Sequence, residues 1–317
     1  MAKKLVEAQL SKKYVTYVRS HPDEYPDADS FLHSLDQWPE KAVRANAQVQ
    51  SIEELCEVWD FEIDNVPWCK DASYFDFAKK LGSTKEHSQG LCYVGDPSAM
   101  LAIECLEIPT NAFVVDMCAA PGGKSVHVLN SLGTMGTLVS NDVDQKRMRI
   151  LKENLGRMLS PFDESQKPNV EITNLKAEDL SEAFAGQADV VVLDAPCSGE
   201  AMMRRSNTAR HQWSEKLVLK MSILQKVLLA HAKVHLKPNG KIVYSTCTFN
   251  SIENEGVMEF GRDSLGLTVE SGASLLEKLT LRNSGDFVPV IEREFGVALY
   301  PHLARGDGQF VGVFKNG

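Results

Sequence analysis

From residue 111 onward, short apolar segments alternate with longer amphipathic ones, and no other feature of the chain constrains its fold as strongly. Strands are predicted at residues 113–115, 137–140, 170–173, 190–193 and 241–244, helices at 124–132, 144–159 and 214–236, and a turn at 237–240. Strands that alternate with helices favour a parallel sheet covered on both faces. The sequence therefore predicts a doubly wound α/β domain.

The first third of the chain lacks this regular alternation. Residues 3–37 are predicted to form helical pieces interrupted by a turn at 21–26. A strand over 43–49, a helix opened by the capping box of Ser51 and Glu54, and a strand ending at Val66 indicate a small α/β unit. An apolar-periodic helix follows at 99–106. We place the domain boundary near residues 90–95, which divides the chain into residues 1–94 and 95–317.

Composition excludes several classes of protein. Apolar runs fall well short of the roughly 18 residues that a membrane span needs, and the first residues form no apolar secretion signal. The seven cysteines are an odd number, without a Cys-x-x-Cys pair or a histidine cluster, which argues against a disulfide framework and a structural metal. We expect a cytoplasmic chain that contacts no membrane and needs no metal.

The net charge of −9 is distributed unevenly. Residues 1–110 carry a net charge of −8, and residues 111–317 carry only −1. Within the second part, residues 200–241 hold nine basic and two acidic side chains, which suits either a polyanion-binding surface or a solvated helix face. Trp213, in this stretch, either stacks a base or packs in the core. The acidic first third suits a protein partner or a narrow RNA contact surface.

In a doubly wound sheet, ligands bind at the carboxyl ends of the strands. The segment over 116–125 passes through small residues and two glycines into a helix, which lets a ligand approach backbone amides. Its ending, Gly123-Lys124-Ser125, matches a nucleotide-triphosphate phosphate loop, but Cys118 stands where that loop needs its first glycine. After the next strand, Asp142 is placed either to accept both hydroxyls of a ribose or to cap the following helix.

Two later strand ends each carry a thiol. Asp194 is followed by Ala-Pro and Cys197, and the strand over 241–244 is followed by Ser-Thr and Cys247. This set suits a pyrimidine, whose C5 becomes nucleophilic when a thiolate adds to C6. A carboxyl group at the N3 and amino edge offsets the developing charge, and another group removes the C5 proton. Asp194 and the two thiols fit these roles, and residue chemistry alone does not decide which thiol attacks.

At these residues the chain resembles the Nol/Nop/Sun family of S-adenosylmethionine-dependent RNA cytosine-5 methyltransferases. The resemblance rests on Asp-Met-Cys-Ala-Ala-Pro-Gly-Gly-Lys at 116–124, Asp-Ala-Pro-Cys-Ser-Gly-Glu at 194–200 and Tyr-Ser-Thr-Cys-Thr at 244–248. It extends over most of the chain, from 41–46 through 90–100 to 301–310. Within the family, the chain looks most similar to bacterial enzymes that modify small-subunit ribosomal RNA, with transfer RNA as the alternative substrate.

The resemblance implies a Rossmann-like domain that methylates C5 of an RNA cytosine, with the base flipped or single-stranded. Cys247 would be the nucleophile, joined covalently to the cytosine, and Cys197 would assist release of the product. Asp194 would face both the methyl donor and the base, with Lys124 in contact with Asp194 or the base. The remaining cofactor contacts implied are Cys118, Ala119, Ala120, Pro121, Gly122, Gly123 and Lys124 around the methionine and ribose part, and Asp142 at the ribose hydroxyls.

The chain departs from the family pattern after the third strand, where an acidic residue usually holds the adenine amino group. Leu175 and Lys176 stand there, so Glu178 or Asp179 is the candidate substitute. Bacterial relatives often continue into an RNA-binding tail, so we expect docking here to rely on the first third and on residues 200–241. The competing hypothesis is an inactive methyltransferase-like fold that only binds RNA, and the presence of both thiols with the carboxylate argues against it.

Overall fold

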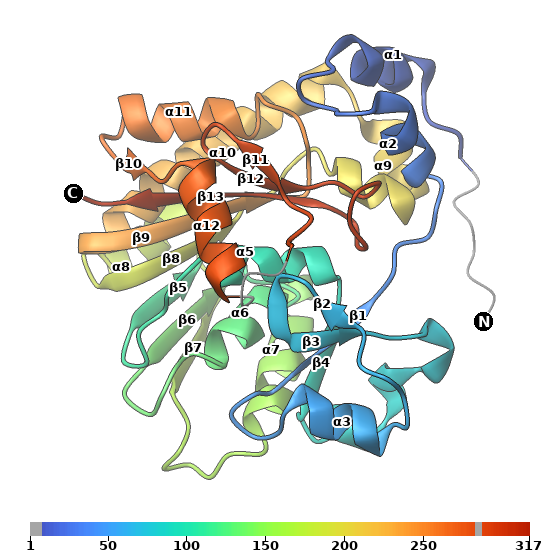
Figure 1. The fold of residues 1–317 in the computed structure, drawn as a ribbon. Coiled ribbons are helices and arrows are strands. Elements are labelled where there is room, and N and C mark those ends of the chain that lie inside the picture. Colours follow the sequence, from blue (N-terminus) through green and yellow to red (C-terminus); the bar gives the residue numbers. More distant parts are fainter. Residues whose placement is uncertain (1–7, 283–286) are drawn as a thin grey trace.

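The computed structural model describes residues 8–282 and 287–317 (Figure 1). The helices of these ranges are α1 (Lys12–Ser20), α2 (Ala28–Ser34), α3 (Ile52–Val58), α4 (Lys85–Ser88), α5 (Leu101–Glu104), α6 (Gly123–Leu129), α7 (Gln145–Leu159), α8 (Ala177–Ala183), α9 (Asn207–Gln212), α10 (Glu215–His235), α11 (Glu255–Asp263) and α12 (Gly272–Arg282). Their strands are β1 (Ala42–Ala45), β2 (Asn65–Val66), β3 (Cys69–Tyr74), β4 (Cys92–Gly95), β5 (Phe113–Asp116), β6 (Thr137–Asn141), β7 (Asn169–Thr173), β8 (Ala188–Asp194), β9 (Leu236–Thr246), β10 (Thr268–Val269), β11 (Ile291–Arg293), β12 (Gly296–Leu299) and β13 (Gln309–Lys315). No helix of the described residues is long and apolar enough to cross a membrane.

The larger sheet of the described ranges has nine strands, in the order β11-β12-β13-β9-β8-β5-β6-β7, with β10 paired to β13. Strands β7, β6, β5, β8 and β9 run parallel, and β13 joins β9 antiparallel. Alternate residues of β8 pack on opposite faces, because Val190 and Val192 join one apolar cluster with α6 and α7, and Val191 and Leu193 join another with α10. The predicted doubly wound fold is confirmed, with an antiparallel edge added.

The smaller sheet, in the order β2-β3-β1-β4, is antiparallel throughout. The predicted capping box of α3 is present, since Ser51 Oγ accepts from the Glu54 N–H at 3.2 Å and the Glu54 carboxylate accepts from the Ser51 N–H at 2.9 Å. The strand predicted over 43–49 was too long, because β1 ends at Ala45. The side chain of Asn46 donates instead to the Gly90 carbonyl at 2.9 Å, and the chain turns away from the sheet.

Helices α1 and α2 lie beside α9 and α10, away from the smaller sheet (Figure 1). The ring of Tyr14 in α1 meets Trp213 edge-on, with centroids 4.7 Å apart, and Phe31 in α2 meets Phe249 at 5.1 Å. Trp213 is buried, and its Nε1 donates to Glu200 at 3.1 Å, so this tryptophan is a core residue. Residues 12–34 therefore pack with the larger sheet, and residues 42–95 form the smaller one.

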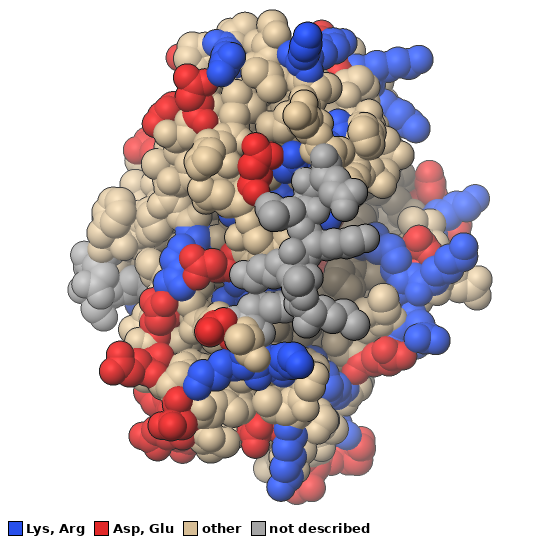
Figure 2. Space-filling view, turned by 90° about the vertical axis from the view of Figure 1, so that its right-hand side faces the viewer, with Lys and Arg blue, Asp and Glu red and all other residues tan. Residues whose placement is uncertain are grey.

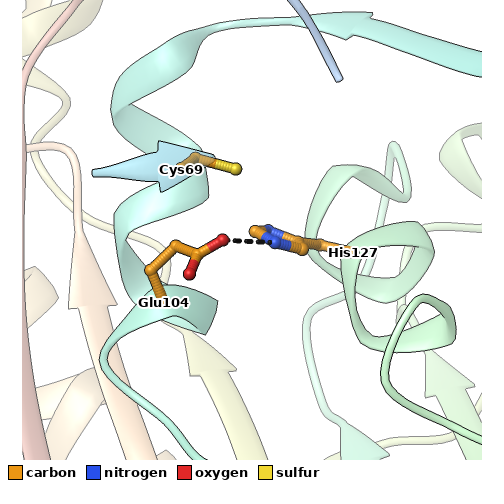
Figure 3. Close-up of side chains that lie close together, drawn as sticks. All are labelled: Cys69, Glu104 and His127. Atoms are coloured by element: carbon orange, nitrogen blue, oxygen red, sulfur yellow. Dashed lines mark hydrogen bonds and ion pairs between the residues drawn. The ribbon is translucent and has the colours of Figure 1, made fainter. Parts of the chain in front are cut away.

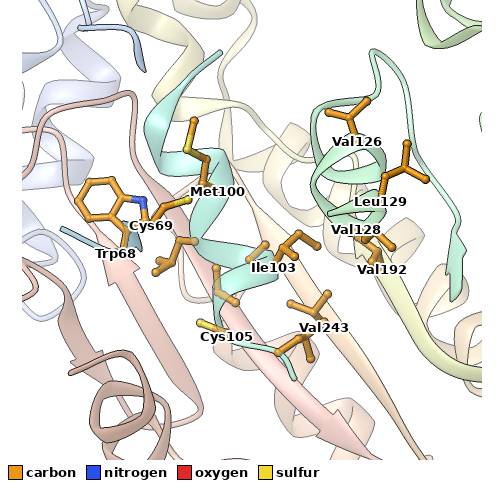
Figure 4. Packing of buried hydrophobic residues seen from close by; sticks show 14 of the residues in the cluster. Trp68, Cys69, Met100, Ile103, Cys105, Val126, Val128, Leu129, Val192 and Val243 are labelled. Atoms are coloured by element: carbon orange, nitrogen blue, oxygen red, sulfur yellow. The ribbon is translucent and has the colours of Figure 1, made fainter. Parts of the chain in front are cut away.

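One apolar cluster runs from the smaller sheet into the larger one (Figure 4). Trp68 and Cys69, at the start of β3, are buried together with Ile103 of α5. The same cluster contains Val192 of β8 and Val243 of β9. Because both sheets bury side chains in this cluster, the two units share a core instead of being joined by an open linker.

The basic stretch over 200–241 does not form one exposed surface. Arg204 and Arg210 are buried, and Lys237 pairs with Asp189 at 2.9 Å. The guanidinium group of Arg210 donates to the Met203 carbonyl at 2.7 Å, so it bonds within the protein. On the face drawn in Figure 2, basic and acidic side chains are interspersed. Arg204 and Arg210 are therefore unavailable to a polyanion, whereas Lys216 and Lys220 are exposed on α10, and their contact with RNA stays a prediction.

Two further local predictions needed adjustment. The helix predicted over 99–106 consists of a 3₁₀ turn at Pro97–Met100 followed by the short α5. The turn predicted at 237–240 is an irregularity inside β9, where the register with β8 shifts. Asn239 adopts a left-handed backbone there, and a side chain at Gly240 would come within 2.9 Å of the Ala188 carbonyl oxygen. Glycine is therefore required where β9 passes β8 so closely.

Candidate active site

The carboxyl ends of β5, β6, β8 and β9 meet at one edge of the larger sheet, where a cleft of about 470 Å³ opens. The segment after β5, the start of α6 and the ends of β8 and β9 form one side of the cleft. Residues from β1, β4 and the turn before β13 form the other side. The cleft thus lies where the parallel topology predicts a ligand site.

The segment after β5, residues 117–123, is called the glycine loop here. Main-chain hydrogen bonds hold it, since the Ala119 N–H donates to the Asn141 carbonyl at 2.8 Å and the Gly122 N–H donates to the Ala119 carbonyl at 2.7 Å. Gly122 has a φ of +111°, which side chains rarely tolerate, and the Ala120–Pro121 bond is cis. A ligand in the cleft therefore meets backbone and small side chains next to the N-terminus of α6.

Asp116 ends β5, is fully buried and lines the cleft. Its Oδ2 accepts from Ser125 Oγ at 2.6 Å, whereas its Oδ1 has no hydrogen-bond partner among the described residues. Burial raises the pKa of Asp116 to about 7. Sequence reasoning missed this carboxyl, although it opens the motif at 116–124. Because Ser125 faces inward to Asp116, its hydroxyl is not placed for a metal–phosphate contact, which argues against the nucleotide-triphosphate loop.

Asp142 lies directly behind the glycine loop. It is buried, and both carboxylate oxygens accept from main-chain N–H groups, Oδ2 from Ala120 at 3.1 Å and Oδ1 from Asp144 at 2.9 Å. Asp142 is not among the residues that line the cleft, and neither are Glu178 and Asp179 at the start of α8. The contacts of these three carboxylates with a cofactor remain predictions.

Lys124 and Asp194 form an ion pair across the cleft floor, with Nζ 2.8 Å from Oδ2. The lysine side chain is only 8% exposed, whereas that of Asp194 is 38% exposed. The other carboxylate oxygen of Asp194 accepts from Ser245 Oγ at 2.7 Å and from Gln309 Nε2 at 3.2 Å. Side chains from α6, β9 and β13 thus orient the carboxylate of Asp194 and leave it accessible from the cleft.

The sulfur atoms of Cys197 and Cys247 lie 3.2 Å apart. Of the two, only Cys247 is among the residues that line the cleft in the described part of the chain. The hydrogen bond to Cys247, together with burial, raises the pKa of the Cys197 thiol well above its usual range. Cys197 is therefore a protonated thiol at neutral pH, and either sulfur can donate the hydrogen bond between them. Burial likewise raises the pKa of Cys118, the third thiol of the site.

Two buried glutamates hold the segments that carry these thiols, residues 195–199 and 247–250, which we call the thiol loops. Glu253 Oε2 accepts from the Ser198 N–H at 2.9 Å. Glu200 accepts from the Phe249 N–H at 2.8 Å and from the Tyr25 hydroxyl at 2.8 Å. Burial raises the pKa of each glutamate to about 7. Neither was singled out from the sequence as a support of the site.

The rim opposite the glycine loop joins two segments far apart in the sequence. Ser98 Oγ accepts from the Gly308 N–H at 2.9 Å, and the Asp96 carboxylate accepts from the Asp307 N–H at 3.0 Å. A side chain at Gly308 would come within 2.5 Å of the Phe249 ring, so only glycine fits there. This packing fixes the width of the cleft.

Cations from the acidic first third also line the cleft. Lys41 and Arg44 lie on this side, and Arg205 is held by Asp307, with Nε 3.0 Å from Oδ1. Arg44 is 1% exposed, and its two terminal nitrogens have no hydrogen-bond partner among the described residues. Lys41 and Arg44 both fall in segment 41–46, where the family resemblance begins, so the sequence did contain a signal for them. The net charge of the first third did not reveal them, because acidic residues outnumber basic ones there.

Comparison with known proteins identifies two families. A family profile described as 16S rRNA methyltransferase RsmB/F matches residues 103–315, and one described as the N-terminal domain of 16S rRNA methyltransferase RsmF matches residues 10–97. Ribosomal RNA small subunit methyltransferase F of Shewanella sp. (strain W3-18-1) is 31% identical over 276 residues, which cover 83% of this chain and 55% of that protein. The Shewanella oneidensis protein of the same name is 31% identical over 271 residues, with the same coverage. The chain spans about half the length of these curated relatives.

Solved structures support the same fold. The structure of NSun6 from Pyrococcus horikoshii with SFG has a TM-score of 0.78 at 19% identity and covers 97% of this chain and 98% of that one. A methyltransferase homolog protein from Pyrococcus horikoshii has a TM-score of 0.72 at 23% identity, covering 97% of this chain and 100% of that one. At these identities the likeness concerns the fold alone.

Proposed function

Because this chain belongs to the family of the 16S rRNA methyltransferases RsmB/F, we propose that it transfers a methyl group from S-adenosylmethionine to C5 of a cytosine in small-subunit ribosomal RNA. One observation carries the proposal: Cys247 lines the same cleft as the Lys124–Asp194 ion pair and the glycine loop. A nucleophilic thiol, an oriented carboxylate and a small-residue loop are the groups that methylation of a pyrimidine at C5 requires.

The residues of the cleft fit S-adenosylmethionine. Its volume of about 470 Å³ is that of a typical cofactor pocket. Asp116 Oδ1 is a buried acceptor that has no hydrogen-bond partner in the described part of the chain, and it is suited to an ammonium group. Residues 118–124 would hold the methionine and ribose part, and Asp142, which lies behind the glycine loop, would have to turn toward the cleft to accept from the ribose hydroxyls. When bound, S-adenosylmethionine supplies an electrophilic methyl group.

In the proposed mechanism, the thiolate of Cys247 adds to C6 of the cytosine. A sulfur–carbon bond forms, and the electrons of the C5–C6 double bond become available at C5 for methylation. Asp194 faces the N3 and amino edge of the base and offsets the charge that develops there. Lys124, Ser245 and Gln309 keep that carboxylate in place, so it does not reorient during addition.

Release of the product needs a base for the C5 proton. Cys197 lies 3.2 Å from the attacking sulfur, so it is close to the base once Cys247 is joined to C6. A thiol with a raised pKa is a strong base in its thiolate form. Because Cys197 is a protonated thiol in the free protein, its own proton must first pass to solvent. Its thiolate then takes the C5 proton, the electron pair of the C5–H bond restores the C5–C6 double bond, and the bond from C6 to sulfur breaks and returns Cys247 as a thiolate.

RNA docking on this face would use the cations that surround the cleft. Lys41, Arg44 and Arg205 line it together with Lys124 and Arg147. Arg44 and Lys124 are buried, so phosphates on either side of a flipped or single-stranded cytosine would meet Lys41, Arg147 and Arg205, whose side chains are at least partly exposed. Whether a protein partner uses the acidic surface of the first third is a separate prediction.

The test is transfer of labelled methyl groups from S-adenosylmethionine to unmodified small-subunit ribosomal RNA and, separately, to unmodified transfer RNA. We expect label in 5-methylcytosine of the ribosomal RNA, and a loss of at least about 10³-fold in Cys247→Ala, because the covalent step disappears. Cys197→Ala should accumulate a denaturant-resistant protein–RNA adduct. Cys56→Ala, which removes a buried thiol far from the cleft, is the matched control.

Other results would change the assignment. An adduct that persists in Cys247→Ala and disappears in Cys197→Ala would exchange the roles of the two thiols. Label found only in transfer RNA would show that the substrate is transfer RNA and not ribosomal RNA. Tight binding of S-adenosylmethionine with no transfer to either RNA would favour the inactive RNA-binding module.

A further inference from the structure

Three side chains of metal-binding type converge outside the cleft (Figure 3). Cys69 of β3, Glu104 at the end of α5 and His127 of α6 each offer one ligand atom, and these atoms all lie within 4.8 Å of one another. Cys69 and His127 are buried, and His127 Nε2 lies 3.1 Å from Glu104 Oε1. None of the three takes part in the proposed methyl transfer.

We propose that Cys69, Glu104 and His127 bind one zinc ion. Thiolate, imidazole and carboxylate are the ligands that zinc takes in proteins, whereas magnesium and calcium prefer oxygen ligands alone. Bonds to tetrahedral zinc place neighbouring ligand atoms about 3.5 Å apart. Because no two of the ligand atoms are more than 4.8 Å apart, side-chain movement of about 1 Å is enough to close them around an ion.

Zinc takes a thiolate and a ring nitrogen that carries no proton, so Cys69 and His127 would bind in these forms. Zinc binding would therefore release the thiol proton to solvent as the sulfur–zinc bond forms, and the charge of the ion would hold the thiolate.

The surrounding charges also suit a bound thiolate. The guanidinium group of Arg44 is buried without a hydrogen-bond partner among the described residues and interacts electrostatically with Cys69, Glu104 and Asp71. Arg282 lies on the solvent side, with Nη1 3.6 Å from Glu104 Oε2. One thiolate and one carboxylate neutralise the two charges of zinc, and Asp71 adds a negative charge that offsets Arg44.

The cluster borders a cavity of about 430 Å³, which leaves room for a fourth ligand. Glu104, His127 and Asn130 line this cavity, and a water molecule there would complete a tetrahedral site. We assign His127 Nε2 as the ligand because it already faces Glu104. The remaining ring atom, Nδ1, and the Oδ1 of Asn130 are both buried without a hydrogen-bond partner among the described residues, and Asn130, the C-cap of α6, lies three positions after His127. A hydrogen bond between them would fix the ring, as outer-shell partners do in metal sites.

The zinc ion would fasten β3 of the smaller sheet to α5 and α6. Because α6 carries Lys124 one turn before His127, the ion would also steady the start of that helix at the cleft. No sequence motif reveals the site, since its ligands come from three separate elements without zinc-finger spacing. The proposal therefore revises the expectation that the chain needs no metal, and it stands independently of the proposed function.

The test uses the full chain purified without chelators. We expect about one equivalent of zinc by elemental analysis, and Co²⁺ substitution should give visible absorption of a tetrahedral site together with a thiolate-to-cobalt charge-transfer band. Cys69→Ala should lose that band, and His127→Gln should weaken Co²⁺ and Zn²⁺ binding by at least about 100-fold, because even outer-shell changes cost 10–100-fold. Cys105→Ala, a buried thiol next to Glu104, is the matched control and should bind as the unchanged chain does.

Thermal unfolding provides a second readout. A chelator should lower the unfolding temperature of the unchanged chain and of Cys105→Ala, and should leave that of His127→Gln unaltered. The proposal is overturned if the unchanged chain binds neither Zn²⁺ nor Co²⁺ more tightly than His127→Gln, or if Cys105→Ala loses the charge-transfer band as Cys69→Ala does. Far-ultraviolet circular dichroism of each variant separates loss of the site from loss of the fold.

Discussion

The glycine loop and the thiol loops reach the same cleft but are held by different kinds of interaction. The glycine loop is held by main-chain bonds within the loop and to the adjacent strand β6, such as those from Gly122 to Ala119 and from Ala119 to Asn141, and by the Asp142 carboxylate. The thiol loops depend on buried carboxylates whose other partners lie far away in the sequence, as Glu200 shows by joining Phe249 to Tyr25. Local backbone chemistry thus shapes the cofactor end of the cleft, and the packed core shapes the base end.

The largest effect should come from the ion pair that joins the two ends. We expect Asp194→Asn to lower kcat about 10²- to 10³-fold at saturating S-adenosylmethionine, because the charge facing the base is removed and Lys124 loses its partner. Affinity for the cofactor, measured by calorimetry, should change much less. Asp189→Asn, at the other end of β8 in the ion pair with Lys237, should leave kcat unchanged. If the kcat of Asp194→Asn stayed within threefold of that of the unchanged chain, the ion pair would not link the cofactor end of the cleft to the base end.

A substitution in the glycine loop should act mainly on cofactor binding. Gly122→Ala places a side chain at a φ of +111° with Leu151 Cδ1 only 3.2 Å away, so the loop must shift. We expect destabilisation on the order of 1–2 kcal/mol and weaker S-adenosylmethionine binding, by denaturant unfolding and calorimetry. Gly156→Ala in α7, where no atom lies within 4 Å, should instead be neutral or stabilising by up to about 1 kcal/mol. Equal behaviour of the two variants would contradict this account.

The pH dependence of the free energy of unfolding should reveal the buried carboxyl group that supports the thiol loops. Burial raises the folded-state pKa of Glu253 to about 7, above its usual 4.5. Its contribution to stability is therefore full below pH 4.5 and is lost as the pH rises through 7. Glu253→Gln removes this titration, so its stability relative to the unchanged chain should improve from pH 4.5 to about 7 and change little at higher pH in urea unfolding. The exposed Glu164→Gln is the control. A difference that is flat with pH would refute the assignment.

The smallest effect concerns the contact of the thiol loops with the N-terminal helices. Tyr25→Phe removes the hydroxyl that donates to Glu200 at 2.8 Å and should cost about 1–2 kcal/mol of unfolding free energy, because a buried carboxylate loses a donor. We expect a modest decrease in kcat with no change in cofactor affinity. If cofactor affinity fell as much as kcat, the two ends of the cleft would be more strongly coupled than their contacts indicate.

Sequence reasoning reached the local features of this molecule. The small residues and glycines over 117–123 impose a tight loop whatever surrounds them, and the parallel topology brings the ends of β8 and β9 together. The proximity of Cys197 to Cys247 and the contact between Lys124 and Asp194 therefore agree with the expected site. In both cases the pattern that predicts the feature lies within a few residues of it.

Features that depend on distant contacts were not predicted. The place of Arg44 in the cleft, the support of the thiol loops by Glu253 and the convergence of Cys69 with His127 each join segments without a shared local pattern. The basic residues over 200–241 show the opposite error. From the sequence, Arg210 could contact a polyanion, but the fold buries its side chain. Charge counted along a chain does not specify which face of the protein carries it.

The packing of α1 and α2 has a consequence for the time course of synthesis. These helices rest on partners such as Trp213, Phe249 and Tyr300, which leave the ribosome long after them. At translation rates of about 5–20 residues per second, these partners of Tyr14 and Phe31 are synthesised roughly 10–50 s after the two rings. During that interval the rings lack their packing partners, so we expect chaperones to bind the N-terminal segment of the nascent chain.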